Sequence, residues 1–439
     1  MPSYLTGCSR QGTQGAGVAP KDRRSELAPV GRTSINCDEV LLLSFYEFFA
    51  GGGMARAGLG RRWNCLFANE IDPKKAAIYT SNWRPDVLKV GDVGTLDTSE
   101  LPGEPDLVWA SFPCQDLSLA GAGRGLSGDR SGTFWPFWRL VRGMVQEGRA
   151  PRMIVIENVC GTLTSRRGKD FAAICSTFAN AGYRYGAIIA DAVHFVPQSR
   201  PRLFVIGVRD DISLQDGLST LGPPASDLWH SGALLTAQAN LPAKARERWI
   251  WWNLPAPRIG GSIEARERPG LLQPMRSMTL GDLIEDCPVG VEWHPESETA
   301  KLLGMMSRVN KEKLDEAKRA GRRMIGAVYK RTRRDERGRK VQRAEIRFDG
   351  LAGCLRTPAG GSSRQIIVVV DGKSVRSRLL SARETARLMG LPDAYKLPPN
   401  YNEAYRLTGD GVVVSVVRHL ARHLFEPLLA RRIPTRIAA

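Results

Sequence analysis

The sequence predicts an α/β fold built on a doubly wound, mostly parallel β-sheet, and two observations carry this prediction. Short apolar runs alternate with helical patterns from residue 39 to about residue 213, as expected for repeated strand–helix units. Several of these runs end abruptly in glycine or in an acidic side chain, as at Gly51 and Glu70. Open α/β sheets bind ligands at the carboxyl ends of their strands. We therefore expect the functional residues at these ends.

Changes in composition along the chain predict its division into segments. Residues 1–38 are rich in Gly, Ser, Arg and Gln with little periodicity, so we expect a disordered tail. Residues 39–213 form the predicted sheet domain. Residues 214–377 contain many Pro and Gly turns and predict a smaller, irregular domain. Residues 378–400 would lie at the junction, and residues 401–439 would return to the first domain.

The charge of the chain predicts a polyanionic partner. Lys and Arg number 63 against 45 Asp and Glu, which gives a net charge of +18. Nucleic acid is the first candidate for such an excess. We find no apolar stretch long enough to span a bilayer and no apolar core of a signal peptide, so we expect no membrane partner. The eight cysteines are scattered singly without a Cys-x-x-Cys pair, which favours a reduced cytoplasmic protein and no zinc.

The first three apolar runs suggest a nucleoside site. The first runs into Gly51-Gly-Gly53 and then a helical pattern, where backbone amides are able to approach a ligand. The dinucleotide fingerprint Gly-x-Gly-x-x-Gly is not met, which counts against a nicotinamide enzyme. Glu70 and Asp92 end the next two runs, and such carboxylates suit a ribose and a base. On spacing alone, Glu70 fits a helix cap equally well.

A lone cysteine, Cys114, follows the apolar run Leu107–Ala110 through Ser-Phe-Pro. The proline stiffens the turn, so the thiol is presented at the carboxyl end of a strand. Glycines and Arg124 come next, and they allow the loop to move. The alternative is a small, buried, apolar cysteine without a chemical role.

Two further elements carry charged residues at strand ends. Glu157 ends a wholly apolar run, and a carboxylate there is costly to bury unless it is paired or protonated. Gln198, Arg200 and Arg202 alternate, so we expect them on one face of a strand entrance. The two arginines would form either an anion clamp or a salt-bridged strut.

The basic segment from Lys311 to Arg343 predicts a nucleic-acid contact. Acidic residues are interspersed up to Arg319, which favours a helix. Beyond Arg322 bases dominate, and Tyr329 and Gly338 indicate a hairpin lying on DNA. The expected contacts are Lys330, Arg331, Arg333 and Arg334. A merely solvated charged face is the alternative.

The ordered set of motifs resembles the DNA (cytosine-5)-methyltransferases. The resemblance covers nearly all of residues 40–208 and resumes from residue 378 to residue 412. It rests on Phe49-Ala-Gly-Gly-Gly, Glu70-Ile-Asp, Pro113-Cys-Gln, Glu157-Asn-Val, Gln198-x-Arg-x-Arg, Arg378-Leu-Leu-Ser-Ala-Arg-Glu and Leu407-Thr-Gly-Asp-Gly-Val. It implies a Rossmann-like, S-adenosylmethionine-dependent methyltransferase fold. Residues 39–213 are then the catalytic and cofactor-binding domain, residues 214–377 the target-recognition domain, and residues 378–400 the family's penultimate motif.

The resemblance implies a covalent mechanism on a cytosine flipped out of duplex DNA. The thiolate of Cys114 attacks C6, with Arg200 or Arg202 as a positive neighbour. Glu157 donates to N3 and Arg202 meets O2. Gln115, Ser118, Arg124 and Gln198 are further expected DNA contacts.

For the cofactor S-adenosyl-L-methionine, the resemblance implies a set of binding residues along the strand ends. Phe49 lies against the adenine, Glu70 binds the ribose hydroxyls and Ile71 packs on the ring. The remaining expected contacts are Gly51, Gly53, Asp92, Pro113 and Asp410. Many family members have asparagine where this chain has Asp410, which puts that contact in doubt. No metal is required.

The implied biological role is the modification enzyme of a restriction-modification system or an orphan methyltransferase. We expect a bacterial or phage-encoded cytoplasmic monomer whose partner is double-stranded DNA, with a cognate restriction endonuclease acting on the same site. Two alternatives stay open: an RNA cytosine-5 methyltransferase and a catalytically inactive DNA-binding relative. The basic segment argues against the first, and intact Cys114, Glu157 and Arg202 argue against the second.

Overall fold

The computed structural model describes residues 42–113, 126, 131–220, 222–223, 228–257, 278–335, 337–356 and 363–430. The predicted tail lies outside the described residues, as do Cys114, Gln115, Ser118 and Arg124. Within the described ranges, no helix is long and apolar enough to cross a membrane.

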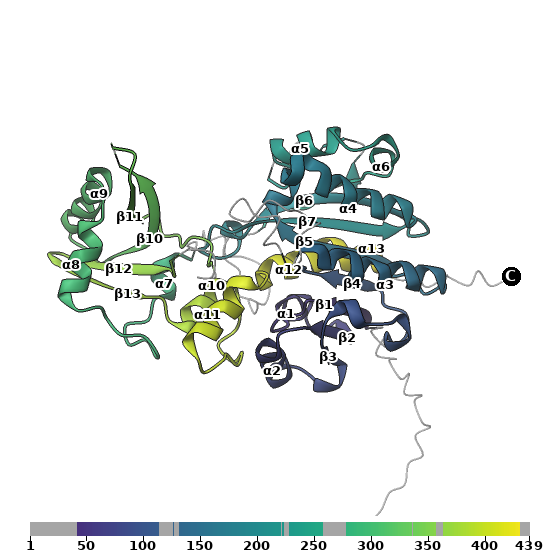
Figure 1. The fold of residues 1–439 in the computed structure, drawn as a ribbon, viewed down its shortest axis with the longest axis horizontal. Coiled ribbons are helices and arrows are strands. Elements are labelled where there is room, and N and C mark those ends of the chain that lie inside the picture. Colours follow the sequence, from purple (N-terminus) through teal and green to yellow (C-terminus); the bar gives the residue numbers. More distant parts are fainter. Residues whose placement is uncertain are drawn as a thin grey trace, which may run out of the picture. The chain divides into compact units, whose positions relative to one another are not determined.

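The first domain is organised by a seven-stranded sheet with the order β3-β2-β1-β4-β5-β7-β6 (Figure 1). Its strands are β1 (Leu43–Phe48), β2 (Trp63–Glu70), β3 (Leu88–Val90), β4 (Leu107–Ala110), β5 (Met153–Val159), β6 (Tyr183–Asp191) and β7 (Pro201–Arg209). β1 to β5 pair in parallel, and only β7 pairs antiparallel, with both β5 and β6. The predicted doubly wound, mostly parallel sheet is confirmed.

Helices and buried side chains cover both faces of this sheet, because successive strand residues point to opposite sides. Phe45 and Trp109 belong to one apolar core with α1 and α12, whereas Tyr46 and Val108 belong to a second core with α3 and α4. The helices around the sheet are α1 (Met54–Leu59), α2 (Pro73–Asn82), α3 (Phe134–Gln146), α4 (Lys169–Asn180), α10 (Ala382–Leu388), α11 (Tyr401–Asp410), α12 (Val414–Leu420) and α13 (Glu426–Leu429).

Strand register brings the functional ends to one edge of the sheet. Phe48 of β1 pairs with Asn69 of β2 and with Ala110 of β4, and Ala110 pairs with Ile156 of β5. The residues that follow these positions in the chain therefore emerge side by side. They include the glycine loop, Glu70, the turn that leads to Cys114, and Glu157.

The second domain is built on a four-stranded antiparallel sheet with the order β11-β10-β12-β13. The strands are β10 (Met324–Arg334), β11 (Lys340–Arg347), β12 (Ile366–Asp371) and β13 (Ser374–Leu379), and the helices are α7 (Leu280–Leu283), α8 (Glu296–Gly304) and α9 (Arg308–Arg319). Leu302 of α8 and Leu314 of α9 belong to one apolar core with Val328 and Val368 of the sheet. Figure 1 shows both helices beside this sheet. This domain is more regular than its Pro and Gly content predicts.

Two expectations for the basic segment are confirmed. The stretch with interspersed acids forms α9, and the following residues form the β10–β11 hairpin, in which Arg334 pairs with Lys340. The short helix α7 begins after Thr279, whose backbone and side chain are linked to Asp282 in a capping box.

Residues 228–254 pack on the first sheet. They include α5 (Gly232–Ala239), α6 (Ala243–Glu247) and β9 (Trp251–Trp252), which pairs with β8 (Ser219–Thr220). The backbone N–H of Tyr185 in β6 donates to Arg248 O, and Ile250 N–H donates back to Tyr185 O. The predicted boundary at residue 214 stays a prediction, and this packing favours a later one.

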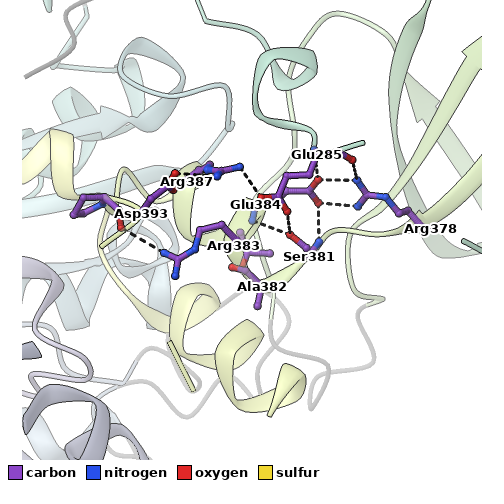
Figure 2. A network of polar contacts seen from close by, with 10 residues as sticks. Glu285, Arg378, Ser381, Ala382, Arg383, Glu384, Arg387 and Asp393 are labelled. Carbon is purple, nitrogen blue, oxygen red and sulfur yellow. Dashed lines mark hydrogen bonds and ion pairs between the residues drawn. The ribbon is translucent and has the colours of Figure 1, made fainter. Parts of the chain in front are cut away.

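A fully buried ion pair lies where β13 leads into α10. Arg378 donates through both terminal nitrogens to the two carboxylate oxygens of Glu384, at 2.8 and 2.7 Å. Figure 2 shows the surrounding contacts: Ser381 N–H and Glu285 N–H also donate to Glu384, and Arg387 pairs with Glu285. Because Glu285 follows α7 and Glu384 lies in α10, the network holds these two helices together.

Candidate active site

The glycine loop after β1 has the backbone conformation that its sequence requires. Gly51 and Gly53 have φ angles of +56° and +77°, which favour glycine. Gly51 N–H donates to Glu70 Oε2 at 2.7 Å, and Asp72 N–H donates to Glu70 Oε1 at 2.8 Å. The buried carboxylate of Glu70 thus fixes the loop and the end of β2 in one position.

The helix-capping alternative for Glu70 applies instead to its neighbour. Asp72 is the N-cap of α2 and accepts from Lys74 N–H at 2.9 Å. Asp92 has a similar local role, since it accepts from Gly94 N–H at the start of a short 3₁₀ turn, but its side chain is exposed. Glu70 at the end of β2 and Asp92 just after β3 lie at the edge of the sheet where the cofactor is expected.

The residues at this edge fit a nucleoside. Ile71 is apolar yet 62 % exposed, which provides a flat surface for a ring beside the Glu70 carboxylate. Phe49 is half-buried, with its ring 6.3 Å from that of Phe137. A Cβ added at Gly51 would meet no atom within 4 Å, so the loop leaves room for a ligand there. S-adenosylmethionine, with its adenosine and charged tail, fits these groups.

Asp410 at the end of α11 is tied to basic residues. Lys75 Nζ of α2 donates to Asp410 Oδ2 at 2.8 Å, and Arg406 Nε lies 3.7 Å from the same oxygen. The pair with Lys75 joins α11 to α2, which starts directly after the Glu70-Ile71-Asp72 strand end. The carboxylate that replaces the usual asparagine is therefore compensated by a lysine.

The residues expected to be catalytic lie next to the cofactor residues, at the ends of β4 and β5 and at the start of β7. We call this part of the sheet the catalytic edge. Asn158 Nδ2 of β5 donates to Phe112 O at 3.2 Å, which anchors the turn containing Pro113 against β5. Glu157 is buried, and its Oε1 lies 3.3 Å from Arg202 Nε of the adjacent strand β7. Phe112 and Pro113 are therefore held next to β5, the strand that carries Glu157.

Arg200 has a different role from the predicted one. It is 2 % exposed, and its terminal nitrogens donate to Leu355 O, Gly409 O and Gly411 O at 2.7–3.2 Å. A guanidinium held by three backbone carbonyls is not available to bind a substrate. We correct its assignment to a strut that joins the β7 entrance to α11 and to the recognition domain.

Gln198 requires the same correction. It is fully buried, its Nε2 donates to Leu388 O at 2.8 Å, and its Oε1 accepts from Leu355 N–H. This amide braces the domain junction, so the prediction of a DNA contact is wrong for this structure. Gln198 and Arg200 precede β7 and both bond to Leu355, while Arg200 and Arg202 both contact Cys354, so the three alternating side chains meet the same loop.

Cys354 is a site residue that the sequence did not indicate. Its Sγ lies 3.2 Å from Arg200 Nη1 and 3.9 Å from Arg202 Nη2. Burial of this thiol opposes its ionisation, but Arg200, Arg202 and Arg356 outweigh burial and lower its pKa. The contact arises because the loop after β11 folds onto the β7 entrance. No motif around Cys354 signals it.

The four basic residues predicted to contact DNA divide between two faces of the hairpin. Arg331 and Arg333 point to the same side as Tyr329, because side chains alternate along a strand. Lys330 and Arg334 point to the other side, and Lys330 lines a cavity with His294, Ser297, Glu298 and Lys301 of the α8 region. Of the four, Arg331 and Arg333 share the face of Tyr329, which packs over Gly353 next to Cys354.

The described residues contain no group of three or more His, Cys, Asp or Glu side chains placed to hold a metal ion.

The doubly wound sheet, with its glycine loop and carboxylates at the strand ends, defines an S-adenosylmethionine-dependent methyltransferase. The family model for C-5 cytosine-specific DNA methylase matches residues 43–426, and the chain belongs to this family.

Individual relatives agree with this assignment. The chain is 23 % identical over 392 residues to the type II methyltransferase M.HhaI of Haemophilus parahaemolyticus, covering 87 % of this chain and 94 % of that one. It is 30 % identical over 186 residues to M.BsuFI of Bacillus subtilis, covering 42 % and 43 %. The solved structure of the Entamoeba histolytica methyltransferase EhMeth matches with a TM-score of 0.54 and 14 % identity, over 88 % of this chain and 99 % of that one. At that identity the last match shows the fold alone.

Proposed function

We propose that this DNA methyltransferase acts through a covalent bond between Cys114 and C6 of a cytosine flipped out of duplex DNA. The observation that carries the proposal is the Glu157–Arg202 pair, 3.3 Å apart, at the strand ends beside the turn that leads to Cys114. A thiol nucleophile needs a partner that stabilises the charge developing on the ring, and this pair supplies both a carboxyl and a guanidinium.

Each group has a specific task in the reaction. The Cys114 thiolate forms a bond to C6, which moves electron density towards C5 and onto N3 and O2. The carboxyl group of Glu157 forms a hydrogen bond with N3, and Arg202 donates to O2. S-adenosylmethionine, when bound, supplies the methyl group. Loss of the C5 proton then restores the C5–C6 double bond and expels the thiolate. We assign no side chain to that proton transfer.

The cofactor is held by the residues at the neighbouring strand ends. Glu70 accepts from the ribose hydroxyls, with its orientation already fixed by Gly51 N–H and Asp72 N–H. Ile71 and Phe49 pack on the adenine, and Asp92 accepts from its amine. Gly51, Gly53, Pro113 and Asp410 line the side of the methionine tail.

The biological role that we propose is DNA modification. Several relatives bear the name type II methyltransferase, M.HhaI among them. We infer a monomeric bacterial or phage-encoded cytoplasmic enzyme that protects DNA from a cognate restriction endonuclease. To test the partner, extracts of the source cells are incubated with plasmid that this enzyme has or has not methylated. Cleavage of the unmethylated plasmid alone supports an endonuclease, and no cleavage of either favours an orphan enzyme. Light scattering of the purified protein gives its molar mass in solution and so tests whether it is a monomer.

The substrate is tested with S-adenosylmethionine tritiated on its methyl group. Purified enzyme is incubated with duplex DNA or with tRNA, and incorporated label is counted. We expect label in DNA that is abolished in Cys114→Ser and strongly reduced in Glu157→Gln. Label in tRNA but not in DNA would favour the RNA methyltransferase alternative. No label in either would favour the inactive relative.

A further inference from the structure

One face of the β10–β11 hairpin leads directly to the catalytic edge. A Cβ added to Gly353 would lie 1.2 Å from the Tyr329 hydroxyl, so Tyr329 packs closely over this glycine. The next residue is Cys354, whose sulfur contacts both Arg200 and Arg202. The hairpin face that carries Tyr329 is thus connected, through Gly353 and Cys354, to Arg202 of the Glu157–Arg202 pair. We call it the Tyr329 face, comprising Tyr329, Arg331, Arg333, Arg343 and Glu345.

A carboxylate lies at the centre of this basic face. Glu345 is opposite Tyr329 in the antiparallel register, and its side chain is 29 % exposed. Its Oε1 accepts from Arg333 Nε at 2.6 Å and lies 2.5 Å from Arg333 Nη2, while its Oε2 lies 3.4 Å from Arg331 Nε. Arg331 also lies over the Tyr329 ring, with its guanidinium carbon 5.6 Å from the centroid. The two arginines, each about half exposed, are therefore held in fixed orientations.

Contact with phosphates alone does not explain Glu345. A carboxylate repels the DNA backbone, so a face that only neutralises phosphates gains nothing from it. Reading base edges is different, because it requires oriented donors together with acceptors. In the major groove a G·C pair offers the guanine acceptors O6 and N7 and the cytosine N4 donor. An arginine side chain donates to O6 and N7, and a glutamate side chain accepts from N4.

We propose that Glu345, with Arg331 and Arg333, reads a G·C base pair next to the target cytosine and so determines the sequence specificity of methylation. This inference rests on the proposed function, since it takes duplex DNA as the substrate. Glu345 acts in two ways: it accepts from cytosine N4, and it holds the guanidinium of Arg333 in the plane of the guanine edge.

The test uses a duplex library with randomised bases on both sides of a fixed cytosine. The library is methylated by each enzyme, and the methylated products are identified by bisulfite sequencing. In Glu345→Gln we expect the preference for G·C over A·T to fall about tenfold or more at one flanking position, with the other positions unchanged. Arg333→Lys keeps the charge but loses the forked donor, so we expect it to relax the same position.

A matched control separates specificity from charge. Glu312→Gln makes the same change of charge on the exposed surface of α9, where Glu312 pairs with Arg308. It should leave every sequence preference as in the wild type. If Glu345→Gln methylates with unchanged preferences and only its rate or affinity differs, Glu345 merely balances charge and the inference is wrong. A wild-type enzyme that leaves the whole library unmethylated would overturn the proposed function itself.

Discussion

The two sheets of this protein use arginine in opposite ways. Around the parallel sheet and its junction, Arg200 and Arg378 are almost completely buried and are held by backbone carbonyls or by a carboxylate. On the recognition hairpin, Arg331 and Arg333 are about half exposed and pair with acids at the surface. The buried arginines hold segments together, whereas the exposed ones are available to a ligand.

This difference shows that net charge overstates the DNA-binding surface. The excess of +18 includes guanidinium groups that never reach solvent. Removing a buried arginine should change stability, and removing an exposed one should change binding.

The largest effect is expected from breaking the buried pair. Arg378→Met leaves the Glu384 carboxylate buried without its charged partner, which typically costs about 3–5 kcal/mol. Chemical denaturation followed by circular dichroism measures the loss. As a control, Arg339→Ala removes an exposed partner of Asp335 and should cost less than about 1 kcal/mol. Equal losses in the two variants would show that burial does not distinguish the two kinds of arginine.

A buried acid beneath the glycine loop predicts a pH dependence of stability. Burial raises the pKa of Glu47 from 4.5 to about 8, while Arg56 opposes the rise. Between these two pH values the folded state binds the proton more tightly than the unfolded state, so stability falls as pH increases. Each pKa unit corresponds to about 1.4 kcal/mol, so the effect is on the order of several kcal/mol.

Glu47→Gln removes this titration. Its melting temperature should equal or exceed that of the wild type at pH 8.5, and the advantage should shrink towards pH 5. Differential scanning calorimetry across this range is the measurement. An advantage that is constant with pH would mean that Glu47 does not titrate in this window.

The two faces of the hairpin should differ in binding. Arg331→Ala should weaken binding to a duplex that contains the enzyme's recognition sequence by about 1–3 kcal/mol. Lys330→Ala, from the opposite face, should change it by less than about 0.5 kcal/mol. Fluorescence anisotropy with labelled duplex measures both. Similar losses in the two variants would place DNA on both faces of the hairpin.

The smallest effect concerns the reactivity of a thiol. Since the pKa of Cys354 is lowered, this thiol should react with iodoacetamide at pH 6.5 faster than the exposed Cys287 does. Arg356→Ala removes one of the three positive neighbours and should slow the reaction. Peptide mass spectrometry resolves the individual cysteines. A Cys354 slower than Cys287 at this pH would show that burial outweighs the arginines.

Much of the fold followed from local patterns. The strands that carry Glu70 and Glu157 were predictable because each apolar run stops at an acidic residue. Pairing of the parallel strands then brings these residues to the same edge of the sheet. The hairpin was predictable from its composition. Alternation along the strand would also have separated Lys330 and Arg334 from Arg331 and Arg333.

Long-range contacts were not readable in the same way. Arg200 and Gln198 lie in a motif typical of a site, but their side chains are used by carbonyls of Gly409, Gly411 and Leu388 far along the chain. Cys354 reaches the arginines only because a loop of the recognition domain folds onto β7. Such contacts depend on how the domains close over each other, which the local sequence does not encode.

The most direct test of the mechanism is covalent trapping on duplex DNA that contains 5-fluorocytosine at the target position. Fluorine replaces the C5 proton, so after methyl transfer the thiol cannot be expelled and the adduct persists. In the presence of S-adenosylmethionine, we expect wild-type enzyme to form an adduct that survives denaturing electrophoresis, with Cys114 in the cross-linked peptide. Cys114→Ser should form none. A persistent adduct in Cys114→Ser, or a cross-link at another cysteine, would contradict the account.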